Sequence, residues 1–251
     1  MDGLAPLALE LTPWIALFMT VVARLSFIIF FMPGIGEQVV PVNVRALLLV
    51  AIALALASSG LLTAPQTQDI GSLFTLILSE ILIGFSLGVM LRLSIWMLTI
   101  AGTVIAQAIG LAQFLGIALE HEAQTLTSNL LSMAGAAILL SANFHVEAIA
   151  ALARLYTDIP LGAVSMINGP MLAQSFFSAM SFALLLAWPF VAFNLLYNIC
   201  LGFINKALPS LMVAFVGAPF MVGAGAALLA LSAGGLLIAW KDRVLQVAGW
   251  L

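Results

Sequence analysis

Long apolar runs, separated by short polar or proline-containing connections, dominate the chain. The apolar positions are continuous instead of alternating, so the pattern predicts helices and argues against a β-barrel. A bilayer core is about 30 Å thick and is crossed by about 20 helical residues. The two longest runs exceed that length, so they are too long for one straight span. The predicted segments are residues 11–32, 44–62, 71–119, 125–155, 170–206 and 211–240.

The longest run, residues 71–119, carries only two formal charges, Glu80 and Arg92. Because it is more than twice the length of one span, it must break, re-enter or leave the lipid. Its second half contains small residues spaced four apart, which lie on one helical face where another backbone can approach closely. These small residues are Gly102, Ala106 and Gly110.

Prolines predict where the helices end or bend. Two prolines and two glycines between residues 33 and 43 predict an ordered turn after the first run. The proline at position 189 is expected to kink the long run around it. The predicted helix breaks are Pro33, Pro41, Pro160, Pro189, Pro209 and Pro219.

The composition supports a membrane class. Of the 251 residues, 64% are hydrophobic and 7% are charged, whereas an ordinary soluble domain has roughly 25% charged residues. The seven basic residues are scattered and the net charge is −3, so no basic patch supports nucleic-acid binding. The single cysteine, Cys200, excludes an internal disulfide. We expect one membrane domain over residues 1–251.

The residues near the two ends of the chain bear on its topology. Asp2 and Glu10 are unlike the basic start of a cleavable signal peptide, so the first run is expected to be retained. Trp240, followed by Lys241 and Arg243, is interpreted as an interfacial anchor. The basic residues there favour a cytoplasmic C-terminus.

Polar side chains within apolar runs are expected to be buried or to lie between subunits. Arg24 lies inside the first run, where it either pairs with a carboxylate on a neighbouring helix or contacts a partner subunit. Glu147 and Arg154 share one helical face in the fourth run, whose end is expected to leave the apolar layer. The other positions of this kind are Glu80, Arg92, His145, Asn194, Asn198 and Lys206.

No motif predicts catalysis or a bound metal. The G-x-S-x-G pattern at residues 84–88 needs a strand, a sharp turn and a helix to form a hydrolase site, but it lies inside a continuous apolar helix. We interpret its glycines as a helix-packing face. Glu120-His121-Glu122 lacks metal-ligand spacing, and His145 is remote in sequence. We therefore expect no enzyme activity, cofactor or metal.

A set of short stretches occurs in a fixed order at residues 23–27, 33–36, 40–45, 83–88, 101–107, 143–145, 158–160, 201–209 and 215–219. Together they resemble the FliR family of type III secretion, which is related to the injectisome SctT family. Each stretch is short, but together the stretches span nearly the whole chain, and their order and spacing match those of the family. The match departs at Phe144 and at Thr157-Asp158, where the family usually has other residues.

The resemblance implies an all-α, polytopic protein of helical hairpins with broken, overlong helices. It implies assembly with FliP-like and FliQ-like subunits into a helical gate, with an FlhB-like subunit nearby. Unfolded flagellar proteins would pass through this gate, in the bacterial inner membrane at the flagellar basal body. Family members are largely lifted out of the membrane plane when assembled, which would account for the overlong runs and inward charges.

The resemblance also implies that a loop of this subunit helps to plug the closed channel, at roughly residues 107–122. From the residues alone, this segment could re-enter a pore or end a packed helix, and the resemblance favours the plug. The plug candidates are Gln107, Gly110, Gln113, Phe114, Gly116, Glu120 and Glu122.

Two alternative functions follow from the residues. A small ion-coupled transporter could use charges in broken helices, namely Arg24, Glu80, Arg92 and Glu147. However, the sequence shows no convincing internal repeat. An intramembrane serine hydrolase could use Ser86 and His145.

Overall fold

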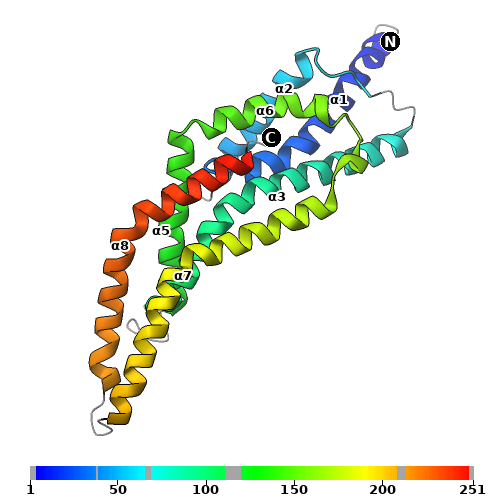
Figure 1. Ribbon diagram of the computed structural model, residues 1–251. Coiled ribbons are helices and arrows are strands. Elements are labelled where there is room, and N and C mark those ends of the chain that lie inside the picture. The colour runs from blue at the N-terminus through cyan, green and yellow to red at the C-terminus, as the bar shows by residue number, and fades with distance from the viewer. Residues whose placement is uncertain (1–3, 38, 66–68, 111–119, 208–212, 249–251) are drawn as a thin grey trace. The chain divides into compact units, whose positions relative to one another are not determined.

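A computed structural model describes residues 4–37, 39–65, 69–110, 120–207 and 213–248, and the described residues form helices and turns without a strand (Figure 1). The predicted all-α class is confirmed. The elements are α1 (Leu4–Phe31), α2 (Val42–Ser58), α3 (Ile70–Ile109), α5 (Glu120–Ser141), α6 (Phe144–Asp158), the 3-10 turn η2 (Val164–Met166), α7 (Gly169–Ala207) and α8 (Val213–Ala248).

Four helical stretches are long and apolar enough to cross a membrane, and the α5–α6 pair would add a fifth. This confirms the membrane class for the part of the chain that the structure describes. Helix α2 has 17 residues and is about 25 Å long, which is less than the thickness of a bilayer core. The four stretches are Pro13–Phe31, Ile70–Ile109, Gly169–Ala207 and Gly217–Gln246.

Helix α3 accounts for most of the longest apolar run. It continues for 40 residues without a break, which corresponds to about 60 Å and is twice the bilayer core. The helix ends at Ile109, and Gly110 follows with a φ of 75°. This left-handed conformation favours glycine and is a common way to end a helix. Residues 111–119 lie outside the described part.

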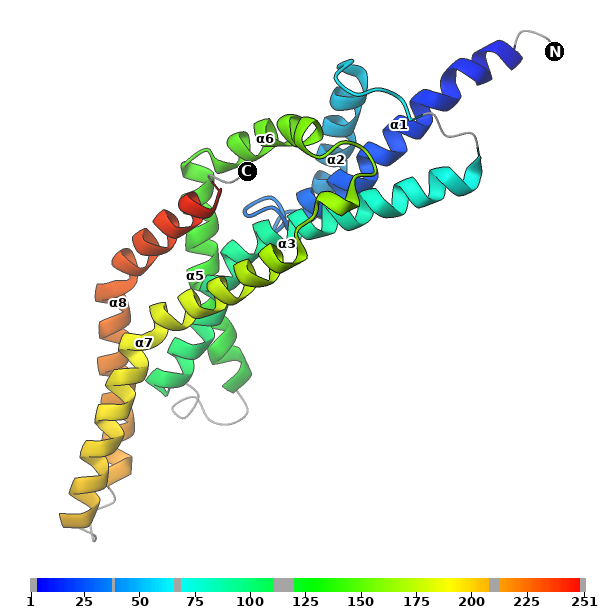
Figure 2. The same ribbon diagram turned by 45° about the vertical axis from the view of Figure 1, so that its right-hand side comes forward.

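The predicted single helix over residues 125–155 is wrong. The structure has two helices, α5 and α6, which meet at an angle of 68°, and both views show this bend (Figures 1 and 2). Asn143 lies in the bend with a φ of 58°. Asparagine is one of the few residues that tolerates this conformation, because its side chain can hydrogen-bond locally. Neither proline nor glycine marks this break, so sequence inspection missed it.

The predicted proline breaks in the connections agree with the structure, while the kink predicted at Pro189 stays a prediction because α7 is continuous there. Prolines occupy the turn between α1 and α2 and the turn after α6, whereas two others lie inside the continuous helices α7 and α8. A proline removes one backbone donor, but the surrounding helix can retain its other hydrogen bonds. Pro33, Pro41 and Pro160 thus lie at helix ends, Pro189 and Pro219 lie within helices, and Pro209 is outside the described residues.

The chain forms two compact units, which are described separately. The first comprises Met1–Leu93 and Leu139–Ser175, together with the terminal residue, and the second comprises Ser94–Ile138 and Phe176–Trp250. Helices α3, α5 and α7 each contribute to both units. The expected single domain over the whole chain stays a prediction.

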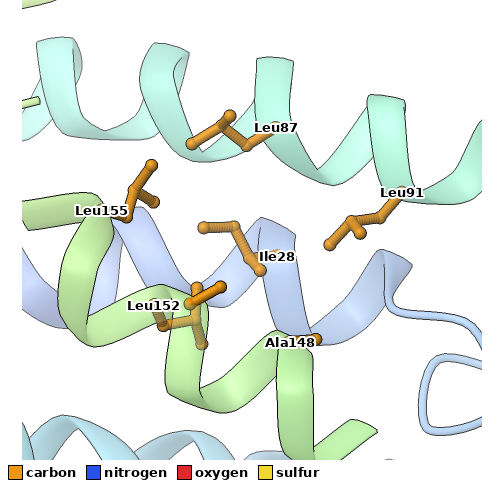
Figure 3. A pocket seen from close by; sticks show the side chains of 7 residues that line it. Ile28, Leu87, Leu91, Ala148, Leu152 and Leu155 are labelled. Atoms are coloured by element: carbon orange, nitrogen blue, oxygen red, sulfur yellow. The ribbon is translucent and has the colours of Figure 1, made fainter. Parts of the chain in front are cut away.

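The core of the first unit forms where α6 packs against α1 and α3. Helix α6 presents apolar residues four apart on one face, as an amphipathic helix does. Glu147 and Arg154 are exposed on the rest of the helix, as expected for a helix that leaves the apolar layer. A small apolar cavity of about 30 Å³ remains between the helices (Figure 3). Its lining residues include Ile28, Leu87, Leu91, Ala148, Leu152 and Leu155.

The second unit has a buried tryptophan near the end of α8. Trp240 is 0% exposed, and its indole Nε1–H donates a hydrogen bond of 2.7 Å to the carbonyl oxygen of Ser94. Gly135 on α5 leaves room for the Trp240 ring. The predicted interfacial anchor is therefore wrong, because Trp240 is covered by the protein itself.

The second unit also contains the small-residue face of α3. A Cβ at Gly102 would lie 2.6 Å from the Cα of Ser128, so α3 and α5 meet backbone to backbone. Ala106 is also buried. The predicted close approach at this face is confirmed.

Candidate functional site

A buried ion pair joins α1 and α3 in the first unit. The Arg24 guanidinium donates from Nε to Oε2 of Glu80 at 2.5 Å and from Nη2 to Oε1 at 3.0 Å. Both side chains are 0% exposed. The geometry is bidentate, which makes such a pair strong and specific in direction. The hypothesis that Arg24 pairs with a carboxylate on a neighbouring helix is confirmed.

The same pair holds the turn that follows α6. Arg24 Nη1 donates to the carbonyl oxygen of Ile159 at 2.8 Å, and Nη2 donates to that of Pro160 at 3.2 Å. In return, the backbone N–H of Gly162 donates to Glu80 Oε1 at 2.7 Å. Two buried charges therefore satisfy three backbone groups of one turn, and they tie that turn to α1 and α3.

Tyr156 completes this arrangement, which we call the Arg24 cluster: Arg24, Glu80, Tyr156 and the turn at residues 159–162. The Arg24 Cζ lies 4.4 Å from the centre of the Tyr156 ring, a cation–π geometry. Sequence reasoning named both charged residues and the helix break at Pro160, but it missed Tyr156 and the bonding of the turn to Arg24 and Glu80.

A second ion pair holds the turn between α1 and α2. Arg92 Nη1 donates to Glu37 Oε1 at 2.7 Å, and these side chains are 22% and 20% exposed. In the same turn, Arg45 Nε donates to the carbonyl oxygen of Val40 at 3.1 Å. The partner of Arg92, Glu37, was missed because it lies in a turn and not in a helix.

The transporter hypothesis needs its charged residues to share one site. Instead, Arg24 and Arg92 are engaged in two different ion pairs, and Glu147 is exposed. No free ion site is formed by these charges among the described residues.

The remaining predicted polar residues do not form a common site. His145 Nδ1 is buried without a hydrogen-bond partner among the described residues. Asn198 Nδ2 donates to Asn194 Oδ1 at 2.7 Å, so these two satisfy one another on α7. Lys206 is exposed. Over the described residues, no three His, Cys, Asp or Glu side chains are grouped to hold a metal ion.

The glycines of the G-x-S-x-G pattern pack against α1. A Cβ at Gly84 would overlap the carbonyl oxygen of Arg24, and a Cβ at Gly88 would lie 2.7 Å from that of Phe27. The Ser86 hydroxyl donates to the carbonyl oxygen of Leu82, one turn earlier in α3. The interpretation as a packing face is confirmed.

We expect Gly84→Ala to separate α1 from α3 and to lower the stability of the protein by about 1–3 kcal/mol, because overpacking a close helix contact is costly. The measurement is thermal unfolding of the purified protein in mild detergent. Gly223→Ala is the matched control, because nothing lies within 4 Å of its added Cβ. Equal unfolding temperatures for the two variants would contradict this account of the α1–α3 contact.

The plug candidates lie mainly at the edge of the described chain. Gln107 is exposed near the end of α3, and Gly110 ends that helix. Gln113, Phe114 and Gly116 lie outside the described residues. Glu120 and Glu122 begin α5, but the positions of their side chains are outside the description. The plug assignment stays a prediction.

The end of α3 before the plug segment is firmly packed. Ala108 and Ile109 are buried, at 6% and 2% exposure. Gly225 on α8 leaves room for Ile109, since a Cβ there would lie 2.7 Å from its side chain. A change intended to affect only the plug must therefore begin after residue 110.

Comparison with known proteins decides the family. Residues 15–247 match the family described as bacterial export proteins, family 1. The chain belongs to this family. It is similar to the flagellar biosynthetic protein FliR of Caulobacter vibrioides, with 32% identity over 228 residues that cover 89% of this chain and 90% of the relative. The predicted relation to FliR proteins is confirmed.

Two other FliR proteins are similar to this chain over most of its length. The FliR protein of Aquifex aeolicus is 29% identical, covering 83% of this chain and 82% of the relative. The FliR protein of Escherichia coli is 28% identical, covering 86% and 84%. The match therefore spans both compact units and is not confined to one of them.

Proposed function

We propose that this chain is a structural subunit of the flagellar type III protein export gate, where it forms part of the channel wall and its plug. The observation that carries the proposal is similarity to FliR proteins over 89% of this chain and 90% of the relative from Caulobacter vibrioides. On this proposal the protein resides in the bacterial inner membrane, at the flagellar basal body. Its C-terminus, with Lys241 and Arg243, faces the cytoplasm.

The lengths and surfaces of the helices support assembly with other subunits. Helices α3 and α7 have 40 and 39 residues, about twice what a bilayer core covers. Large apolar side chains on α7 remain exposed, including Leu185 at 65%, Trp188 at 63% and Phe203 at 71%. An apolar surface that extends beyond the lipid needs protein to cover it. FliP-like and FliQ-like subunits are the proposed covering partners, with an FlhB-like subunit nearby.

The proposed mechanism is gating and requires no active site. Unfolded flagellar proteins pass through the assembled channel, and the plug segment at residues 107–122 closes it when no protein is exported. A narrow apolar constriction excludes water and ions, so closure preserves the membrane potential. Opening requires displacement of the plug, while the ion pairs of the first unit keep its helices in place.

Co-expression with FliP-like and FliQ-like subunits from the same source tests the proposal. We expect gentle detergent extraction to yield one large complex, in which native mass spectrometry detects this chain together with both partners. Extraction of this chain alone serves as the control. Recovery of a monomer or homodimer from the co-expressing cells, without either partner, would overturn the proposed function.

A further inference from the structure

Helices α3 and α5 cross in the second unit at a point that allows only one register. A Cβ at Gly102 would lie 2.6 Å from the Cα of Ser128, so α3 can have no side chain there. If α3 slid by one turn, Leu98 or Ala106 would replace Gly102, and the Cβ of either would overlap the α5 backbone. One-turn shifts of packed helices are one means of conformational switching, but this crossing offers no second position.

Two further contacts hold α3 and α5 together. Thr103 Oγ1 and Ser128 Oγ lie 3.4 Å apart, at hydrogen-bond distance, and Ser128 is 4% exposed. About two turns further along α5, Gly135 leaves room for the Leu98 side chain of α3. Separating the helices would break this hydrogen bond and open a void beside glycines, which have no side chains to fill it.

Helix α8 supports α3 at two points of the same unit. Trp240 Nε1 donates to the carbonyl oxygen of Ser94, and Gly225 leaves room for the Ile109 side chain. Ser94 and Ile109 are as far apart in α3 as Gly225 and Trp240 are in α8, about 22 Å along each helix. The two helices therefore run antiparallel in one register. The Trp240 ring also lies beside Gly135, so α8 contacts α5 as well.

We propose that this three-helix bundle, formed by residues 94–109, 126–138 and 225–240, stays closed while the gate exports protein. Helices α3 and α5 flank the plug segment, so a channel could open by their separation. On our proposal, opening occurs without it, and the α3–α5 crossing remains a fixed support for the plug segment. This inference rests on the proposed function, because it requires a gate that opens and closes.

A disulfide across the α3–α5 crossing tests the proposal in cells whose gate contains only the altered chain. Thr103→Cys and Ser128→Cys are combined with Cys200→Ser, which removes the one native thiol. We expect no loss of flagellar protein secretion when the disulfide forms. Cells with Cys200→Ser alone, oxidised in the same way, are the matched control. Secretion that stops on oxidation of the cysteine pair alone, and resumes on reduction, would overturn the proposal.

The rate of disulfide formation gives a second measurement that does not depend on secretion. It is compared in purified gates at rest and in gates that hold an arrested exported protein in the channel. We expect equal rates, because the two cysteines stay neighbours in both states. A much slower reaction in the arrested gates would overturn the proposal, as would failure of the disulfide to form at rest. Failure of the wild-type chain to assemble would instead count against the proposed function.

Discussion

Replacing Arg24 with methionine is expected to destabilise the first unit by about 3–5 kcal/mol, because it leaves the Glu80 carboxylate buried without its cation. The remaining carboxylate still accepts from the Gly162 N–H, but no cation compensates its buried charge. The carbonyl oxygens of Ile159 and Pro160 lose their donor at the same time. Thermal unfolding in mild detergent, together with the yield of folded protein, measures the effect.

The double variant Arg24→Met, Glu80→Leu separates the cost of an unpaired charge from the loss of the turn. With both charges removed, no ion is buried, and apolar residues of similar size often replace a buried ion pair at little cost. The backbone groups of the turn remain without partners, at a cost of about 1 kcal/mol each. We therefore expect the double variant to be less stable than wild type but more stable than Arg24→Met.

Arg92→Met is the matched control for this experiment. Its ion pair with Glu37 is about one-fifth exposed, so water can solvate the carboxylate that remains. A loss of about 1 kcal/mol or less is expected. If Arg24→Met and Arg92→Met unfold at the same temperature, burial does not make the Arg24–Glu80 pair contribute more to stability than the partly exposed Arg92–Glu37 pair. A double variant that is less stable than Arg24→Met would contradict the argument about unpaired charge.

Part of the Arg24 cluster was predictable from the spacing of residues. A charge within an apolar run needs a partner, and Glu80 is the one carboxylate of the longest run. Glu80, Gly84 and Gly88 are four residues apart, so they share one face of α3. The glycines bring that face against α1 at Arg24 and Phe27. The helical spacing therefore predicts that Glu80 lies on the face of α3 that packs closely against a neighbouring helix. It does not predict which helix that is.

Other parts of the fold depend on tertiary context that local sequence signals do not carry. The bend at Asn143 has no proline or glycine, whereas Pro189 and Pro219 lie within continuous helices. Trp240 followed by basic residues has the pattern of an interfacial anchor, but its indole is buried against Ser94, which is 146 residues away. Such positions are decided by packing between distant segments, and no local rule identifies them.

Deleting residues 111–116 is expected to leave the export gate assembled but permeable to ions. The first unit is untouched by this deletion, and α3 keeps its buried end at Ala108 and Ile109. A longer deletion from Gln107 would remove that packed end as well, so a leak could then result from damage to the wall. Deletion of residues 111–116 therefore tests the plug segment without removing the packed end of α3.

Conductance of the purified complex in planar bilayers, at rest and without exported protein, measures the leak. We expect the deletion to raise ion conductance well above that of the wild-type complex, because a constriction that excludes water has been removed. A variant with glycine and serine in place of residues 111–116 keeps the length of the connection but loses Gln113, Phe114 and Gly116 as plug candidates. If both variants leak, side chains close the channel, whereas a leak in the deletion alone would indicate that the length of the connection matters. An assembled deletion complex with wild-type conductance would show that this segment is not the plug.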